Sequence, residues 1–549
     1  MNDSSPSAVI VARHAPEKPV TPLHLLVVLA ILIVVLVWGA TFLFGSRGLQ
    51  YQRYFALLAF FSVATAVFVL ARIRRGQLPL FEIPVYITCM AFLQFGLIPL
   101  RNFIDPSQRD WRLSANGEEL VQALSYTVLG MLAYWLGCLA AQHKRKGRRP
   151  PGPREEEMSR GRSDRWTMSC AVALFAISFA TRFYLFKTRA YGFVGSAEKY
   201  QASLTSSQVL SFISQFGMLA LIVAGIEAYR NRSNPIWRLL LFTFFCSEVF
   251  WGALSGFRLP IMESFLVVGI VSSFVQQRLN LRWILLPVFG FILFYPISNA
   301  YRGVLAKRGA TPVTSFESAG QAGRMALQNA TEYAGSSQAF WKTGVALTLS
   351  RLDSLTVFAD ELTLSPEARD YVRGDTPWWL LPVYPFIPRL FWSSKPALLE
   401  AGRLTIVLGR SGATDPTGGT SSTMPTYIGD LHLQFGLVGV LAGMFLLGLV
   451  TQWLTNSVVG PLDPRKLFVY VTILISCFNL EVDAFALWAS LIKFLAILSA
   501  LGWVIYRPRR HRARKRGVIG TAAQWRGTTQ TPRRWEGKGR ELETGNGRV

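Results

Sequence analysis

The sequence has few charged residues, few cysteines and few histidines. Only 16% of its 549 residues are charged, against about a quarter in a typical soluble domain, while 51% are hydrophobic. The five cysteines show neither the paired spacing of a disulfide framework nor the spacing of metal ligands. Because the apolar residues are also collected into long runs, this composition excludes an ordinary soluble globular protein.

The sequence also lacks the short motifs of common soluble enzymes. It contains no P-loop, no dinucleotide fingerprint, no H-E-x-x-H and no C-x-x-C. The glycine-rich segment GRSGATDPTGG lacks the lysine that a phosphate-binding loop needs. Of the five histidines only His432 is predicted on the outer side, without an accompanying Asp/His cluster. We therefore expect neither a metal nor a cofactor.

Apolar runs of about 17–25 residues predict helices that cross a membrane. The runs lie at 23–44, 54–72, 80–100, 119–141, 166–187, 209–229, 237–255, 259–276, 283–300, 432–454, 466–484 and 486–506. No cleavage pattern follows the first run, so we interpret it as a retained helix. The predicted fold class is an all-α polytopic membrane protein with about twelve transmembrane helices.

The basic residues predict how the chain is oriented. The formal net charge is +25, and the segment 507–549 alone holds 13 Lys and Arg against three Glu. A second basic block, His143–Arg165, separates two apolar runs. An excess of Lys and Arg in loops beside spans is typical of the cytoplasmic side, which predicts that both termini are cytoplasmic. No nucleic-acid-binding motif accompanies the charge, so nucleic acid is not an expected partner.

One loop, at 301–431, is long enough to hold structure of its own, and it is predicted to face outward. It includes a predicted helix around Ser315–Glu332 and the aromatic run TPWWLLPVYPFIPRLFW, which favours a membrane interface or a groove with one apolar wall. The predicted organisation is a cytoplasmic segment at 1–22, nine membrane helices within 23–300, the loop at 301–431, three helices within 432–506 and a basic cytoplasmic tail at 507–549.

Arginines of the outer side lie beside aromatic residues and prolines. They are Arg258, Arg302, Arg351 and Arg389, with Lys395 six residues after the last. Planar guanidinium groups bind phosphate oxygens bidentately, so convergent arginines would suit a diphosphate. An equally open alternative is that each one pairs with lipid phosphates or local carboxylates.

Acidic residues on the same side could move a proton. The candidates are Asp353, Asp360, Glu361, Asp430, Glu481 and Asp483. Ionisable groups at membrane depth are costly, which makes them functional candidates. The alternative interpretation for Glu481 and Asp483 is that they close a short turn just outside the hydrocarbon.

Four segments resemble a known family, the Wzy-type O-antigen and exopolysaccharide repeat-unit polymerases. They are SGFR at 255–258, NAYRG at 299–303, FIPRLFWSSKP at 386–396 and PTYIGDLHLQFGLVG at 425–439. The order of features, with one long outer loop before the last few helices, is similar as well. The resemblance implies a glycosyltransferase that polymerises undecaprenyl-diphosphate-linked oligosaccharides at the outer face of a bacterial inner membrane.

The resemblance also implies roles for individual residues. Asp430 would accept the proton of the attacking hydroxyl, while Arg258, Arg302 and Arg389 would stabilise the leaving diphosphate without a metal. The expected substrate-binding residues are Arg351, Lys395, Trp378, Trp379, Tyr384, Trp392, Tyr427 and His432. Expected partners are the undecaprenyl-diphosphate-linked oligosaccharide, membrane lipid and a chain-length regulator protein.

Three alternatives remain open. An O-antigen ligase would share the topology and the arginines, and a polysaccharide flippase would share the many spans. A glycosyltransferase that uses a polyprenyl-phosphate sugar usually has an acidic pair in its first outer loop, and the segment GSRGLQYQR at 45–53 has no carboxylate.

Overall fold

The computed structural model describes a little over half of the chain in detail. The described residues are 49–73, 81–100, 117–142, 164–188, 191, 209–210, 212–255, 259–276, 286, 290, 296–298, 300–301, 304, 315–334, 345–346, 348–349, 352–374, 387, 400–409, 425–458, 463–477 and 484–506. The chain divides into two units, Met1–Arg507 and Pro508–Val549. The second unit lies outside the described residues, so the fold below is that of the first.

Within those ranges the regular structure is entirely helical, which confirms the all-α prediction for that part of the chain. The helices are α2 (Leu49–Ile73), α3 (Ile83–Ala91), η2 (Phe92–Leu97), α5 (Gly117–Ala140), α7 (Asp164–Lys187), α10 (Phe216–Arg230), α11 (Pro235–Ser255), α12 (Leu259–Gln276), α14 (Phe316–Ala334), α16 (Ser354–Leu362), α17 (Pro366–Arg373), α18 (Glu400–Val407), α19 (Tyr427–Val458), α20 (Pro464–Cys477) and α21 (Ala484–Ile505).

Six of these helices are long and apolar enough to cross a membrane, namely α2, α5, α7, α10, α11 and α19. Shorter apolar helices occupy Ile83–Leu97, Pro260–Gln276 and Ser490–Ile505. The predicted run 23–44 and most of 283–300 lie outside the described residues, while each of the other ten predicted runs contains a helix. The chain is therefore a helical protein with several candidate membrane spans.

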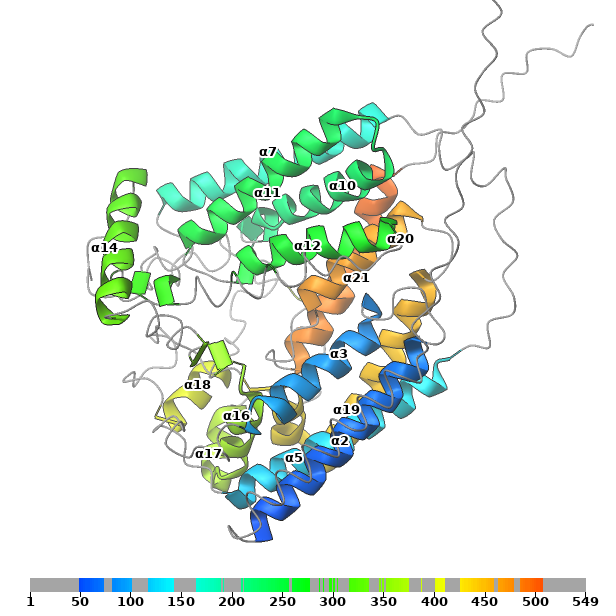
Figure 1. Ribbon diagram of the computed structural model, residues 1–549, viewed down its shortest axis with the longest axis vertical. Coiled ribbons are helices and arrows are strands. Elements are labelled where there is room, and N and C mark those ends of the chain that lie inside the picture. Colours follow the sequence, from blue (N-terminus) through cyan, green and yellow to red (C-terminus); the bar gives the residue numbers. More distant parts are fainter. Residues whose placement is uncertain are drawn as a thin grey trace, which may run out of the picture. The chain divides into compact units, whose positions relative to one another are not determined.

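The helices form two groups that are joined by α20 (Figure 1). One group contains α2, α3, α5 and α19, and the other contains α7, α10, α11 and α12. The helix α20 contacts α19 as well as α10 and α12. The aromatic rings of Phe81, Phe274 and Tyr470 meet where α3, α12 and α20 come together.

The most extensive helix contact of the described residues joins α5 to α19. A side chain at Gly137 would collide with the backbone carbonyl of Phe445, and one at Gly448 would collide with that of Tyr134. Small residues allow membrane helices to approach this closely. The Tyr134 and Thr451 hydroxyls, 3.1 Å apart, add a hydrogen bond beside the contact.

The helix α19 turns back on itself at Gly436. This glycine has φ 63° and ψ −157°, which interrupts the helix and favours a residue without a side chain. The Tyr427 hydroxyl donates to the Gly443 carbonyl at 3.4 Å, although 16 residues of continuous helix would separate them by about 24 Å. The segment 427–435 therefore folds against the start of 437–458, and the predicted span 432–454 contains the turn.

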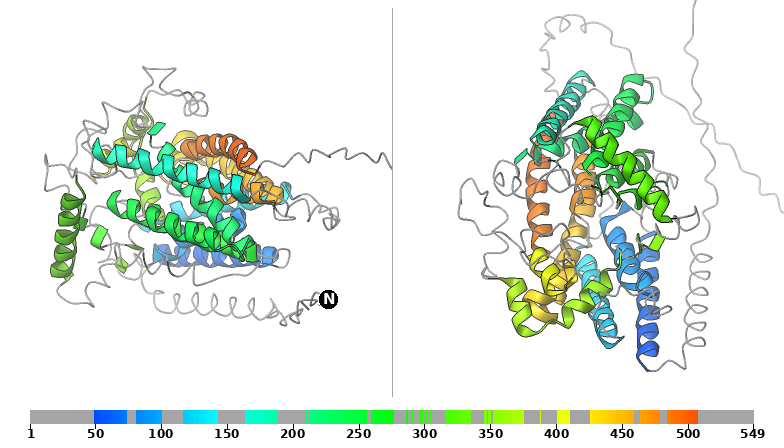
Figure 2. Two further views of the ribbon diagram at one scale, coloured as in Figure 1. Left: turned by 90° about the horizontal axis from the view of Figure 1, so that it is seen from above. Right: turned by 90° about the vertical axis from the view of Figure 1, so that its left-hand side faces the viewer.

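The helix α14 agrees with the helix expected around Ser315–Glu332. Figures 1 and 2 show that it crosses the direction of α11 and α12 instead of running along them. Its first residue, Phe316, stacks on Phe186 with ring centroids 5.1 Å apart, and the buried Ala322 and Ala326 contact Tyr301 and Val304. Small apolar residues on one face let this helix pack across the ends of others.

A buried ion pair joins α7 to α11. Arg182 donates from both terminal nitrogens to the two carboxylate oxygens of Glu248, at 2.7 and 2.8 Å. The carboxylate rests against Gly217 of α10, where a side chain would displace it. Planar, bidentate geometry is what allows such a pair to offset part of its desolvation cost.

We predict that Arg182→Ala lowers the free energy of unfolding by about 3–5 kcal/mol, because it leaves the Glu248 carboxylate buried without its partner. The measurement is denaturant or thermal unfolding of the purified protein in detergent.

The matched control is Arg165→Ala, which removes an exposed arginine from the same helix. It should change stability by less than about 0.5 kcal/mol. A double variant, Arg182→Met with Glu248→Leu, should recover most of the loss, since no buried charge then remains. Equal effects of Arg182→Ala and Arg165→Ala would contradict the importance of the pair.

Candidate functional site

The predicted outer loop contributes a short helix, α16, to the core of the first helix group. Its N-terminus is capped by Asp353, whose side chain accepts from the Thr356 backbone N–H at 3.1 Å. The fully buried Leu355, Phe358 and Ala359 form one face of the helix, at the spacing that a helix requires. The helix α16 packs against α5, η2 and α19. A loop element thus lies among helices that are candidate membrane spans.

The neighbouring element η2 is a π-helix. Its Ile98 N–H donates to the Leu93 carbonyl, five residues earlier in the chain. Single π-helical turns in otherwise α-helical segments are frequent at functional sites. The Tyr54 hydroxyl of α2 donates to the Gly96 carbonyl of this turn at 3.4 Å. The Tyr54 side chain is also close enough to the Asp353 carboxylate to interact with it electrostatically.

Buried carboxylates concentrate where α16 meets α19. Asp360 and Glu361 are fully buried, and Asp353 and Asp430 are 6% and 2% exposed. The Glu361 carboxylate lies directly against Gly429, at a position that a side chain would occupy. Among the described residues, no three His, Cys, Asp or Glu side chains are close enough to hold one metal ion.

Asp430 stabilises the start of another helix. Its Oδ2 accepts from the backbone N–H of Ala484, the first residue of α21, at 2.9 Å. Unpaired N–H groups at a helix N-terminus need such an acceptor, and a carboxylate also interacts favourably with the helix dipole. The structure thus gives Asp430 a capping contact, and its role as a proton acceptor stays a prediction.

His432 is partly exposed, unlike the carboxylates of Asp360, Glu361 and Asp430. Its ring contacts those of Tyr126 and Phe358 at centroid distances of 5.3 and 5.8 Å, and these two rings also contact each other at 6.5 Å. This aromatic cluster therefore joins α5, α16 and α19. Within it the His432 side chain is partly exposed, which the buried carboxylates are not.

Two arginines of α17 lie near this histidine. Ser365 caps α17 by accepting from the Ala368 N–H at 3.2 Å, and Pro366 starts the helix. Arg369 donates to the Leu362 carbonyl at 2.9 Å, and Arg373 donates to the Leu433 carbonyl. Both guanidinium groups are close enough to the His432 ring to interact with it electrostatically.

The backbone contacts of these arginines leave part of their hydrogen-bonding capacity for other groups. Each guanidinium carries five N–H donors, and the carbonyl bonds use one apiece. The Arg373 guanidinium also pairs with the exposed Asp370 at 3.3 Å, while Arg373 itself is partly buried. Positive charge is thus held beside His432 by two bonds to the backbone of α16 and α19.

Most of the residues expected from the sequence lie outside the described ranges. They are Arg258, Arg302, Arg351, Trp378, Trp379, Tyr384, Arg389, Trp392 and Lys395. Of the others, Tyr427 is fully buried, accepts from the Trp488 indole N–H at 3.1 Å and donates to Gly443, so it belongs to the core. The structure brings together Asp430, His432 and Glu361, which the sequence had singled out.

Sequence reasoning missed Arg369, Arg373 and Tyr126. The segment SPEARDYVR at 365–373 has a serine cap, a proline at the first helical position and charged residues, which is also the pattern of a solvent-exposed helix. Tyr126 lies within an apolar run, where an aromatic residue is expected in any case and does not indicate a functional site. Only the folding of the loop onto α5 and α19 shows that these residues share a site.

Comparison with known proteins gives one match. Residues 120–459 match a family model that is described as a domain of unknown function, DUF8712, over well more than half of the chain. The chain belongs to this family. The DUF8712 segment begins within α5 and ends just after α19, so it includes the glycine-packed helix pair, α16, α17 and every residue of the junction. No curated protein and no solved structure matches the chain.

We predict that Asp430→Ala lowers the free energy of unfolding by about 0.5–2 kcal/mol, the usual cost of losing a helix cap, because the Ala484 N–H loses its acceptor. Asp430→Asn should stay much closer to wild type, since its side-chain oxygen can still accept. The measurement is unfolding of the purified variants in detergent.

Val438→Ala on the same helix is the control, because that side chain is 76% exposed and its shortening should leave stability nearly unchanged. Equal stability of the Ala and Asn variants at position 430 would show that the capping contact does not matter.

Proposed function

We propose that this protein is a glycosyltransferase that joins undecaprenyl-diphosphate-linked oligosaccharide repeat units into a polysaccharide, either an O-antigen or an exopolysaccharide. The observation that carries the proposal is the junction of α16, α17 and α19. There a partly exposed histidine, two arginines and several buried carboxylates gather, and a loop element lies among candidate membrane spans.

The proposed reaction exchanges one bond to an anomeric carbon for another. A hydroxyl of the incoming repeat unit attacks the anomeric carbon at the end of the growing glycan. The bond from that carbon to the diphosphate breaks, and undecaprenyl diphosphate leaves with the bonding electron pair. The hydroxyl proton passes to a base of the protein.

His432 is the group of this junction best suited to accept that proton. A neutral imidazole accepts a proton at one ring nitrogen, and this side chain is partly exposed where Asp430 and Glu361 are buried. Asp430 would then have a structural role, because its side chain holds the start of α21 against α19. This assignment revises the role that the sequence alone suggested for Asp430.

The arginines would stabilise the leaving diphosphate. Guanidinium groups bind phosphate oxygens directly, and a surrounding of low dielectric strengthens the interaction. Arg369 and Arg373 are held beside His432 by carbonyl groups, and Arg258, Arg302, Arg351 and Arg389 remain candidates from the sequence. We propose that these cations make a divalent metal unnecessary.

The proposal includes a topology and a location. Twelve spans with both termini in the cytoplasm would place the junction at the periplasmic face of a bacterial inner membrane. There it would meet lipid-linked glycan, and a chain-length regulator protein could contact the same face. The basic blocks at 143–165 and 507–549 support this orientation.

Two alternatives would use the same chain differently. An O-antigen ligase would transfer finished glycan to a lipid A core. A polysaccharide flippase would form no bond, and the buried Arg182–Glu248 pair favours this alternative, because charges inside a helix bundle are common in transporters.

We predict that the purified protein extends a lipid-linked repeat unit in detergent with EDTA present. His432→Gln should slow this reaction by roughly 10²–10⁴-fold, the usual contribution of a general base. The products are separated by length on a gel, where a ladder identifies a polymerase.

Arg165→Ala, an exposed substitution at the start of α7, is the control and should leave the ladder unchanged, because this end of α7 contacts the end of α21 that lies opposite Ala484. A strict requirement for a divalent cation would contradict stabilisation by arginine alone. Transfer to a lipid A core without a ladder would support the ligase, and transport without bond formation would support the flippase.

A further inference from the structure

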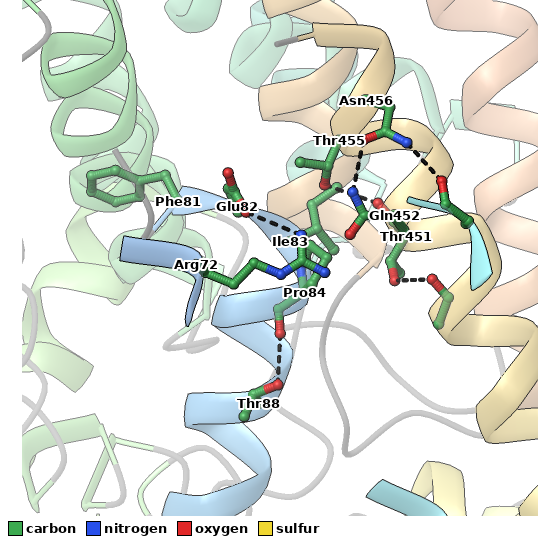
Figure 3. Close-up of polar contacts among 12 residues, drawn as sticks. Arg72, Phe81, Glu82, Ile83, Pro84, Thr88, Thr451, Gln452, Thr455 and Asn456 are labelled. Carbon is green, nitrogen blue, oxygen red and sulfur yellow. Dashed lines mark hydrogen bonds and ion pairs between the residues drawn. The ribbon is translucent and has the colours of Figure 1, made fainter. Parts of the chain in front are cut away.

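A second polar cluster lies far along the chain from the junction, where α2 ends and α3 begins. Figure 3 shows Arg72 of α2 reaching across the start of α3 toward Gln452 of α19. Arg72 is 5% exposed and Gln452 is 3% exposed. Thr451 and Thr455 of α19 are also buried here. None of these residues takes part in the proposed reaction.

The polar atoms around Arg72 are incompletely matched. Its Nη1 lies 3.5 Å from Glu82 Oε2, and its guanidinium carbon lies 5.0 Å from the centre of the Phe68 ring. Its Nη2 is buried and, within the part of the chain that is described, has no hydrogen-bond acceptor. A buried guanidinium nitrogen without an acceptor is costly, so this donor points to a bound group.

Gln452 presents the complementary atom. Its Nε2 donates to Asn456 Oδ1 at 2.7 Å, and Asn456 Nδ2 in turn donates to the Ala141 carbonyl at 2.9 Å. These bonds fix which end of the Gln452 amide is the oxygen. That oxygen, Oε1, is buried and has no donor among the described residues. Figure 3 shows the Arg72 and Gln452 side chains pointing toward each other, and each carries a buried polar atom without a partner among the described residues.

The charges and hydrogen-bonding requirements of Arg72, Glu82 and Gln452 determine which kind of group can bind here. A cation is disfavoured by Arg72, and an anion is disfavoured because Glu82 already balances the guanidinium and Gln452 Oε1 would oppose it. A neutral hydroxyl group meets both requirements, since it accepts through oxygen and donates through hydrogen. We propose that one hydroxyl group binds between Arg72 Nη2 and Gln452 Oε1 and links α2 to α19.

Two sources can supply this hydroxyl. One is an ordered water molecule, which commonly fills buried sites with two to four polar partners. The other is the glycerol headgroup of a phospholipid, because polar sites between membrane helices also bind headgroups.

Radiolytic footprinting in H₂¹⁸O tests for the water. Tyr134 is the reporter, because it is fully buried from bulk solvent, is close enough to Arg72 to interact with it electrostatically, and has an aromatic ring that keeps the oxygen of an added hydroxyl radical. Hydroxyl radicals formed from a bound water should add ¹⁸O to Tyr134 in the wild-type protein. Gln452→Met keeps the length of the side chain without the acceptor and should abolish this label, while Arg53→Met should not.

Native mass spectrometry tests for the lipid in the same preparations. If the hydroxyl comes from lipid, the wild-type protein should retain a glycerol-headgroup phospholipid over a choline-headgroup one, and Gln452→Met should lose this preference. Either the ¹⁸O label or the lipid preference, dependent on Gln452, supports the site. If the wild-type protein shows neither, the proposal is overturned, whatever the variants do.

Discussion

The backbone contact between α5 and α19 is the constraint on which the rest of the first helix group depends. Gly137 and Gly448 allow the two helices to touch without side chains between them. This contact fixes α19 after Gly436, and the turn at Gly436 then returns the segment 427–435 to the same neighbourhood. The position of Asp430 and His432 therefore follows from glycines that lie outside the junction itself.

Several charged groups inside the helix groups contact a partner from a different helix. Arg182 pairs with Glu248 between α7 and α11, and Asp430 caps α21 from α19. Such contacts contribute little attraction after desolvation is included, but a mismatched helix register would leave a charge buried alone. They therefore select one arrangement among many that apolar packing would allow.

The sequence predicts the helices well because the length of each apolar run can be read directly from the sequence. It does not depend on which other segment the helix packs against. It predicts the junction only in part. Asp430, His432 and Glu361 stood out as ionisable groups near apolar runs, whereas Arg369 and Arg373 lie on a helix that looks exposed in the sequence. The turn at Gly436 was missed for a related reason. One glycine within a long apolar run is compatible with a straight helix, and only the return contact of Tyr427 shows otherwise.

The central claim is that lipid-linked glycan binds at the junction of α16, α17 and α19. It is tested most directly by placing a photoreactive amino acid at Tyr126, which is partly exposed and whose ring lies 5.3 Å from that of His432. Irradiation with an undecaprenyl-diphosphate-linked oligosaccharide should then crosslink the protein to the glycan lipid. The same amino acid at Leu136, exposed on α5, should give far less product with this glycan lipid. Equal crosslinking at both positions, or none at Tyr126, would contradict the account.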